Sequence, residues 1–166
     1  MTLKPRSVGI GLLVVVAMTS AGAVDLPALR EGLWAVRIES TYLPANNRTL
    51  DQSTLCRNHA YDSYVRQRDR EAQSRCSILQ EHFTASRWSQ EARCVIGERT
   101  VHTVFTEIFA VDEVRAQSHS TYTPPLANVT GLTTIMESHY VGACPPGIHP
   151  GDRTTADGTV QHLWPR

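Results

Sequence analysis

Five β-patterned stretches follow one another in the second half of this chain, and the links between them are short. The stretches are rich in threonine, valine, isoleucine and phenylalanine, which favour strands. Consecutive strands joined by only a few residues pair antiparallel, because a parallel pair needs a crossover of about a dozen residues or more. We therefore expect a meander built from Ile78–Thr84, Ser86–Ile96, Glu98–Ala110, Glu113–Thr123 and Leu132–Ala143.

Two further elements are predicted ahead of the meander. Gly32–Leu43 alternates polar and apolar residues, which predicts a first strand with Trp34 facing inward. Asn58 is a good N-cap residue, and the segment after it predicts an amphipathic helix that ends near Gln73. The apolar positions at helical spacing are Tyr61, Tyr64, Val65 and Ala72.

These elements predict a mainly β fold: an antiparallel curved sheet, or a partly open barrel-like meander, with one short amphipathic helix. Pro44–Gln52 is polar and rich in turn residues, so no strand is predicted there. Residues 24–146 form one predicted domain, and residues 147–166 are read as an extended tail because prolines and glycines recur from Pro145 onward. Asp157-Gly158 would suit a small hairpin turn, but its flanks are polar.

The first 23 residues have the three-part layout of a secretory signal. Lys4 and Arg6 precede an apolar run, Val8–Met18, which leads to Ala21-Gly22-Ala23. Cleavage after Ala23 is therefore expected. A retained anchor is the alternative, but a membrane span needs about 20 apolar residues, and two polar residues interrupt this run. We expect a periplasmic product without stable membrane insertion.

All four cysteines lie beyond the predicted signal, and an even number in an exported chain predicts two disulfides. The residues are Cys56, Cys76, Cys94 and Cys144. Three pairings are open, and the sequential one, Cys56 with Cys76 and Cys94 with Cys144, is favoured because it needs no crossed loops. A zinc site is the other reading, but Cys-x-x-Cys spacing is missing.

Net charge gives little support for a polyanionic partner. The chain has 16 basic and 16 acidic residues, and Lys4 and Arg6 leave with the predicted signal. The exported product is then slightly acidic. Because nucleic acids and anionic membranes attract basic proteins, neither is an expected partner.

Several local sequences occur together in a fixed order and carry a family resemblance. They are Gly32-Leu33-Trp34, Cys56 ahead of a short helix, Cys76, Trp88 followed by Cys94, and Gly142-Ala143-Cys144-Pro145. From about Leu29 to Pro146, the chain resembles a bacterial exported family known only as domain of unknown function 3617. The resemblance implies a periplasmic, β-rich protein of a Gram-negative bacterium, and it implies no activity, ligand or catalytic residue.

Catalytic and metal-binding patterns are missing from the sequence. Gly-x-Ser-x-Gly, Cys-x-x-Cys, a phosphate-binding glycine loop and His-x-His do not occur. A hairpin at Val111-Asp112 would place His102 diagonal to His119, but His139 would lie farther along the sheet. We therefore predict no catalytic residue, metal or cofactor. A hydrolase whose residues meet only in the folded chain remains an alternative.

Two tryptophans are the remaining candidate site residues. Trp34 and Trp88 lie on predicted amphipathic strands, where they would form either the core or an aromatic floor for an apolar ligand. The run Arg66–Glu71 mixes charges, and Asp62 and Arg66 are spaced for an ion pair on a solvated helix face. We expect a non-enzymatic binding module for a small apolar ligand or an envelope protein; the alternative is a structural or stress-related envelope protein without a pocket.

Overall fold

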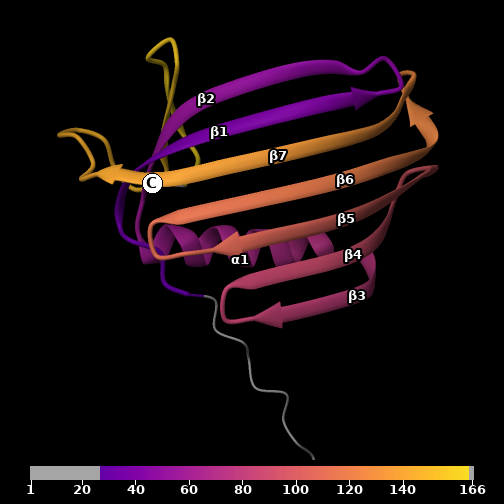
Figure 1. The fold of residues 1–166 in the computed structure, drawn as a ribbon, viewed down its shortest axis with the longest axis horizontal. Coiled ribbons are helices and arrows are strands. Elements are labelled where there is room, and N and C mark those ends of the chain that lie inside the picture. Colours follow the sequence, from indigo (N-terminus) through magenta and orange to yellow (C-terminus); the bar gives the residue numbers. More distant parts are fainter. Residues whose placement is uncertain (1–26, 165–166) are drawn as a thin grey trace, which may run out of the picture.

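The computed structural model describes residues 27–164, so the predicted signal at residues 1–23 lies outside the described residues. One helix lies across one face of a single large sheet (Figure 1). The elements are β1 (Gly32–Leu43), β2 (Asn47–Arg57), α1 (His59–Gln73), β3 (Cys76–Thr84), β4 (Arg87–Ile96), β5 (Arg99–Phe109), β6 (Glu113–Leu126), β7 (Val129–Gly142), β8 (Asp152–Thr155) and β9 (Val160–His162).

The sheet is antiparallel and open. Its nine strands lie in the order β3-β4-β5-β6-β7-β1-β2-β8-β9, so β3 and β9 form its two edges. The five strands β3 to β7 are the predicted meander. β1 then pairs with β7, about a hundred residues later in the chain, as well as with β2. The predicted fold class, mainly β with one helix and two disulfides, is confirmed.

Three strands were not predicted from the sequence. β2 begins at Asn47, inside the stretch interpreted as a polar turn, and its first six residues are all exposed. β8 and β9 lie inside the segment interpreted as an extended tail, and they join through the turn at Asp157-Gly158, where the Thr155 amide donates to the Thr159 carbonyl at 2.9 Å. These strands form by backbone pairing with a neighbouring strand. Their residues do not alternate regularly between buried and exposed, so the sequence carries no strand signal.

Helix α1 begins and ends where the sequence predicts. The Asn58 side chain accepts a hydrogen bond from the Tyr61 amide at 2.8 Å and so caps the first turn. At the other end, Gln73 accepts a hydrogen bond from Gln90 of β4 at 3.2 Å. We call the sheet surface under α1 the helix face and the opposite surface the open face. Among the described residues, no helix has the length and apolar character needed to cross a bilayer.

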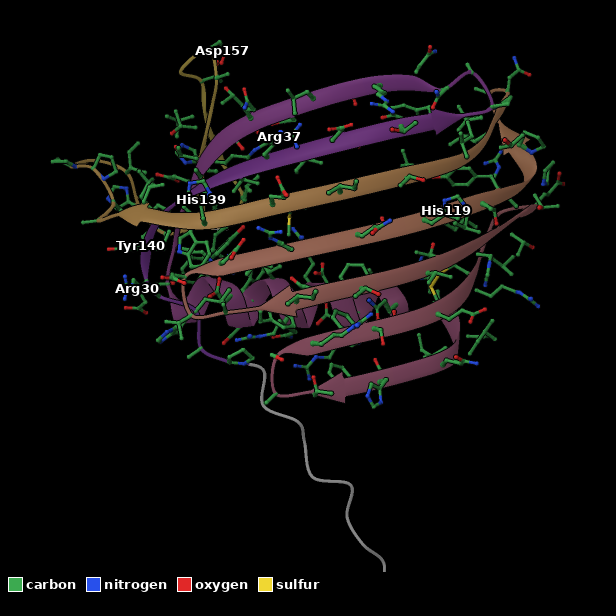
Figure 2. The ribbon with its side chains drawn as sticks, in the orientation of Figure 1. Arg30, Arg37, His119, His139, Tyr140 and Asp157 are labelled. Carbon is green, nitrogen blue, oxygen red and sulfur yellow. A yellow bond between two sulfur atoms is a disulfide. The ribbon has the colours of Figure 1, made fainter. Side chains whose placement is uncertain are left out.

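The core lies between α1 and the helix face, near the β5–β6 turn. Trp34 is fully buried, as predicted, and its indole nitrogen donates to the Arg30 carbonyl at 2.8 Å. The Arg57 guanidinium lies over its ring at 5.0 Å, and Tyr140 meets it edge to face at 6.3 Å. Figure 2 shows Tyr140 beside Arg30 at this end of the sheet. The other buried apolar residues here are Leu29, Phe109 and Val114.

Gly32 opens β1 at a point where no side chain fits. Its φ is +136°, and an added Cβ would collide with the Gly142 carbonyl and the Tyr140 ring. The register between β1 and β7 shifts just after this position. Glycine is therefore required here both for its backbone conformation and for the close approach of β7.

The two predicted disulfides are present, but the favoured pairing is wrong. The bonds join Cys56 to Cys144 and Cys76 to Cys94, with Cα separations of 5.6 and 4.1 Å. Cys76 and Cys94 are direct partners on the neighbouring strands β3 and β4. Cys56 is the next-to-last residue of β2, on one side of β1, and Cys144 lies two residues after β7, on its other side. Strand neighbours in the sheet, rather than neighbours along the chain, decide which thiols meet.

Candidate binding site between the helix and the sheet

Two polar residues, Ser138 and Glu107, lie on the helix face among the apolar core residues. Ser138 of β7 pairs directly with Val114 of β6. Val114 pairs in turn with Phe109 of β5, and Glu107, two residues from Phe109, faces the same way. The strand register therefore brings a hydroxyl and a carboxyl into neighbouring rows beneath α1.

The Ser138 hydroxyl is a buried polar group without a partner. The residue is 3 % exposed, and its Oγ makes no hydrogen bond to any described residue. Leaving a buried polar group unsatisfied costs about 1–3 kcal/mol, and most such groups in folded proteins are paired. This hydroxyl therefore has unused hydrogen-bonding capacity within the layer between helix and sheet.

Glu107 is a partly buried carboxyl whose environment favours the neutral form. Burial, the largest cause, raises its pKa to about 7; Arg57 lowers it, Asp69 raises it and Arg66 lowers it. No hydrogen bond is among the causes of this pKa shift. Near neutral pH the carboxyl is therefore present in both forms, so it can donate or accept a hydrogen bond.

Aromatic rings flank the carboxyl on the β4 side. Trp88 pairs with Glu107 across the two strands. Its ring stacks on Phe83 at a centroid distance of 5.5 Å and meets Phe105 edge to face at 5.0 Å. The indole nitrogen of Trp88 donates to the Glu81 carboxylate at 3.2 Å.

The two candidate tryptophans therefore have different environments. Trp34 is a core residue, whereas Trp88 is only partly buried and packs against the edge of the core. Two roles were predicted for these tryptophans, a core residue or an aromatic floor for an apolar ligand. Trp34 has the environment of a core residue, and Trp88 has the partial exposure that an aromatic floor needs.

Three attachments hold α1 over this layer at its N-terminal half. Arg57 forms an ion pair with Asp62 at 2.8 Å, and both side chains are largely buried. The predicted pairing of Asp62 with Arg66 on a solvated face is therefore wrong, because Asp62 turns inward to the guanidinium that covers the core tryptophan. Trp164, near the C-terminus, contacts the rings of Tyr61 and Tyr64 at 6.1 and 6.3 Å.

Both disulfides also attach the segment that carries α1. Cys56 lies three residues before the helix and Cys76 three residues after it. The first is bonded to the end of β7, and the second to β4. The helix is thus tied covalently to the sheet on both sides, so its two ends cannot separate far from the strands.

The predicted histidine geometry is correct, and these histidines lie on the open face. His102 pairs with Thr121 as expected, and so lies diagonal to His119. His102 contacts Glu91 at 2.7 Å, while His119 contacts the Thr133 hydroxyl at 2.9 Å. Figure 2, which looks onto this face, shows His139 well separated from His119. The described residues contain no group of three metal-ligating side chains.

A shallow, open depression of about 500 Å³ lies over β3, β4 and β5. Its lining residues include His82, Glu91 and Phe105. Its openness and mixed lining differ from the enclosed, mainly apolar sites that usually hold small ligands. The layer beneath α1 is the stronger candidate because it combines a buried hydroxyl and a partly buried carboxyl with aromatic rings.

The sequence analysis missed both Glu107 and Ser138. A signal for Glu107 was present, because it interrupts the inward series Val101, Thr103, Phe105 and Phe109 with a charge. Ser138 has no such signal, since serine is common on both faces of a strand. Its burial depends on the neighbouring strands and on the helix above it.

Comparisons with known protein families, with curated protein sequences and with solved structures find no match to this chain. The resemblance to the exported family described above therefore stays a prediction. The site has to be interpreted from its own residues.

Proposed function

We propose that this chain works in the periplasm, after export, as a non-enzymatic module that binds a small, mainly apolar molecule beneath α1. Export is supported by the sequence of the first 23 residues and by two disulfides, which persist mainly in oxidising compartments. The family resemblance agrees with this location.

One observation carries the binding proposal: the Ser138 hydroxyl is buried on the helix face without a protein partner. The partly buried Glu107 carboxyl, whose pKa burial raises to about 7, lies in the neighbouring row of the same face. Ligand sites typically combine apolar walls with a few polar groups that fix orientation. Residues with perturbed pKa values are also concentrated at such sites. A ligand that supplies hydrogen bonds here would remove the cost of leaving the Ser138 hydroxyl unpaired and would give the Glu107 carboxyl a partner.

The lining also indicates the class of ligand. The rings of Trp88 and Phe105 offer an apolar surface for the body of the molecule. A hydroxyl or amine group on the ligand would donate to the Glu107 carboxylate. The ligand is therefore an aromatic or aliphatic compound with at least one hydrogen-bond donor, rather than a polyanion or a sugar chain.

A fluorescent probe with these properties tests the site directly. N-Phenyl-1-naphthylamine has an apolar body and one N–H donor, and its emission increases in apolar surroundings. We expect saturable binding by the exported protein, weakened about tenfold by Glu107→Leu, because a hydrogen bond to a charged group contributes about 1.5–3 kcal/mol. Thr106→Leu is the matched control, since it changes the next residue of β5, on the opposite face of the sheet.

Equal probe affinity for the wild type and Glu107→Leu would contradict the proposed site. Native mass spectrometry of protein purified from its own periplasm gives an independent test. A co-purifying small molecule that is lost in Glu107→Leu would support the binding function. A bare polypeptide together with no saturable probe binding would favour the structural envelope protein instead.

A further inference from the structure

Large apolar side chains are exposed at both ends of the sheet, and the two most exposed, Val95 and Ile96, lie at one of them. One end carries the β1–β2, β4–β5 and β6–β7 turns and the start of β3, on the right in Figure 1. We call it the apolar end, because large apolar side chains are exposed along it. They are Ile78 (42 % exposed), Leu79 (44 %), Val95 (64 %), Ile96 (63 %) and Leu126 (47 %).

The turns and strand ends that carry these side chains are bonded to one another. The Cys76–Cys94 disulfide joins the start of β3 to β4, just before the β4–β5 turn. The Arg99 guanidinium donates to the carbonyls of Pro124 and Pro125 at 3.0 and 3.3 Å, which joins that turn to the β6–β7 turn. The rim from β3 to β7 is therefore held together by covalent and hydrogen bonds.

The charge of the apolar end is opposite to that of the exported chain as a whole. The turns and strand ends that form it, residues 44–48, 74–79, 93–99 and 123–130, contain four arginines and one glutamate. Arg75 and Arg93 are exposed beside the apolar residues. At the other end, the β5–β6 turn carries Asp112 and Glu113 instead.

We propose that the apolar end docks on an anionic lipid surface. Peripheral membrane sites combine apolar side chains that enter the headgroup region with arginines that contact phosphates. Val95 and Ile96 are consecutive residues at the end of β4 and form a strongly exposed apolar tip. Contiguous exposed apolar surface marks interaction sites. The arginines are the feature that selects an anionic lipid surface, because Arg75 and Arg93 are exposed in the same strand ends as the apolar residues and can contact headgroup phosphates.

Vesicle flotation of the exported protein, with its signal removed, tests this proposal. We expect binding to vesicles of phosphatidylglycerol and phosphatidylcholine, and much weaker binding to phosphatidylcholine alone. Val95→Ser together with Ile96→Ser should lower the partition coefficient at least about fivefold, because two apolar contacts are lost. Val111→Ser is the matched control, since Val111 is 56 % exposed in the β5–β6 turn at the opposite end of the sheet.

A charge variant separates the two contributions. Arg75→Gln with Arg93→Gln should weaken binding to the anionic vesicles and remove most of its dependence on lipid charge. Unchanged melting temperatures would show that all variants are folded. No binding by the wild type, or equal losses in the Val111→Ser control and the Val95/Ile96 variant, would overturn the proposal.

Discussion

The helix face and the open face of the sheet are built from the same strands but use side chains very differently. On β1, Trp34 points to the helix face and is fully buried, whereas Arg37 points to the open face and is 41 % exposed in its side chain. Arg37 forms ion pairs with Glu39 and Glu137, at 2.9 and 3.6 Å. Residues on opposite faces of one strand therefore contribute to a buried apolar core and to solvent-exposed ion pairs.

The difference between the faces indicates where the free energy of folding is concentrated. Surface ion pairs contribute about 0–1 kcal/mol each because water screens them. Burial of a large aromatic side chain contributes several times more. The stability of the fold therefore depends mainly on the helix face and on the contacts that keep α1 over it. Four measurements test whether the helix face contributes more to the free energy of unfolding than the open face does.

The largest effect is expected from the disulfide that ties α1 to β7. Replacing Cys56 and Cys144 by alanine removes a loop closure between residues 88 positions apart, which contributes roughly 4–5 kcal/mol on the chain-entropy model. The Cys76/Cys94 pair, 18 positions apart, should contribute roughly 3 kcal/mol on the same model. Urea unfolding of both double variants would measure these values, and equal losses would contradict this order.

Trp34→Ala tests the buried face directly. We expect a loss of about 3–5 kcal/mol in the free energy of unfolding, because the change leaves a cavity in the core. It also removes the surface over which the Arg57 guanidinium lies. Arg37→Ala, three residues along the same strand, should cost less than about 1 kcal/mol. Similar losses for the two variants in urea unfolding would refute the asymmetry between the faces.

Glu107 predicts how stability depends on pH. Its pKa rises from 4.5 to about 7 on folding, so the folded chain holds a proton that the unfolded chain has released. This contribution is complete below about pH 4.5 and is lost as pH rises to about 7, a change of about 3 kcal/mol.

The variant Glu107→Gln keeps the size of the side chain and removes its titration. The difference in unfolding free energy between this variant and the wild type should therefore grow in favour of the variant from pH 4 to pH 8. Urea unfolding at a series of pH values gives the two curves. Parallel curves would show that Glu107 does not titrate under the helix as its burial indicates.

The smallest expected change in stability comes from replacing either of two buried serines by alanine, and the two changes should differ. Ser138→Ala removes a hydroxyl without a protein partner, so ligand-free protein should be unchanged or up to about 1 kcal/mol more stable. Ser53→Ala removes the acceptor of a hydrogen bond from Arg153 at 3.0 Å and should cost about 1 kcal/mol. Thermal unfolding would compare them, and a larger loss for Ser138→Ala would mean that its hydroxyl does have a partner.

Elements with a local signal were predicted correctly. The bounds of β1 match the alternating stretch, and α1 follows its Asn58 cap. The meander strands agree within a few residues. In β2 the exposed residues at its start, such as Asn47 and Leu50, show no alternation of burial, so period and composition could not reveal it.

The candidate site was predicted less completely. Trp34 was identified as inward-facing from its strand alone, and the structure confirms it. Ser138 could not be found, because its burial arises from α1 and from strands distant in the sequence. Glu107 required the observation that a charge lies on the inward side of β5, and its raised pKa depends on how closely the helix packs above it.

Taken alone, the amino-acid sequence determined the strand periods, the helix cap, the number of disulfides and the near balance of charge. These properties depend on a few neighbouring residues or on composition. Only the tertiary structure decided that Cys56 meets Cys144, that β1 lies beside β7, and that Arg75, Arg93 and the exposed Val95 and Ile96 lie at one end of the sheet. Each of these depends on which distant strands become neighbours, and many residues together set that arrangement through burial and backbone pairing.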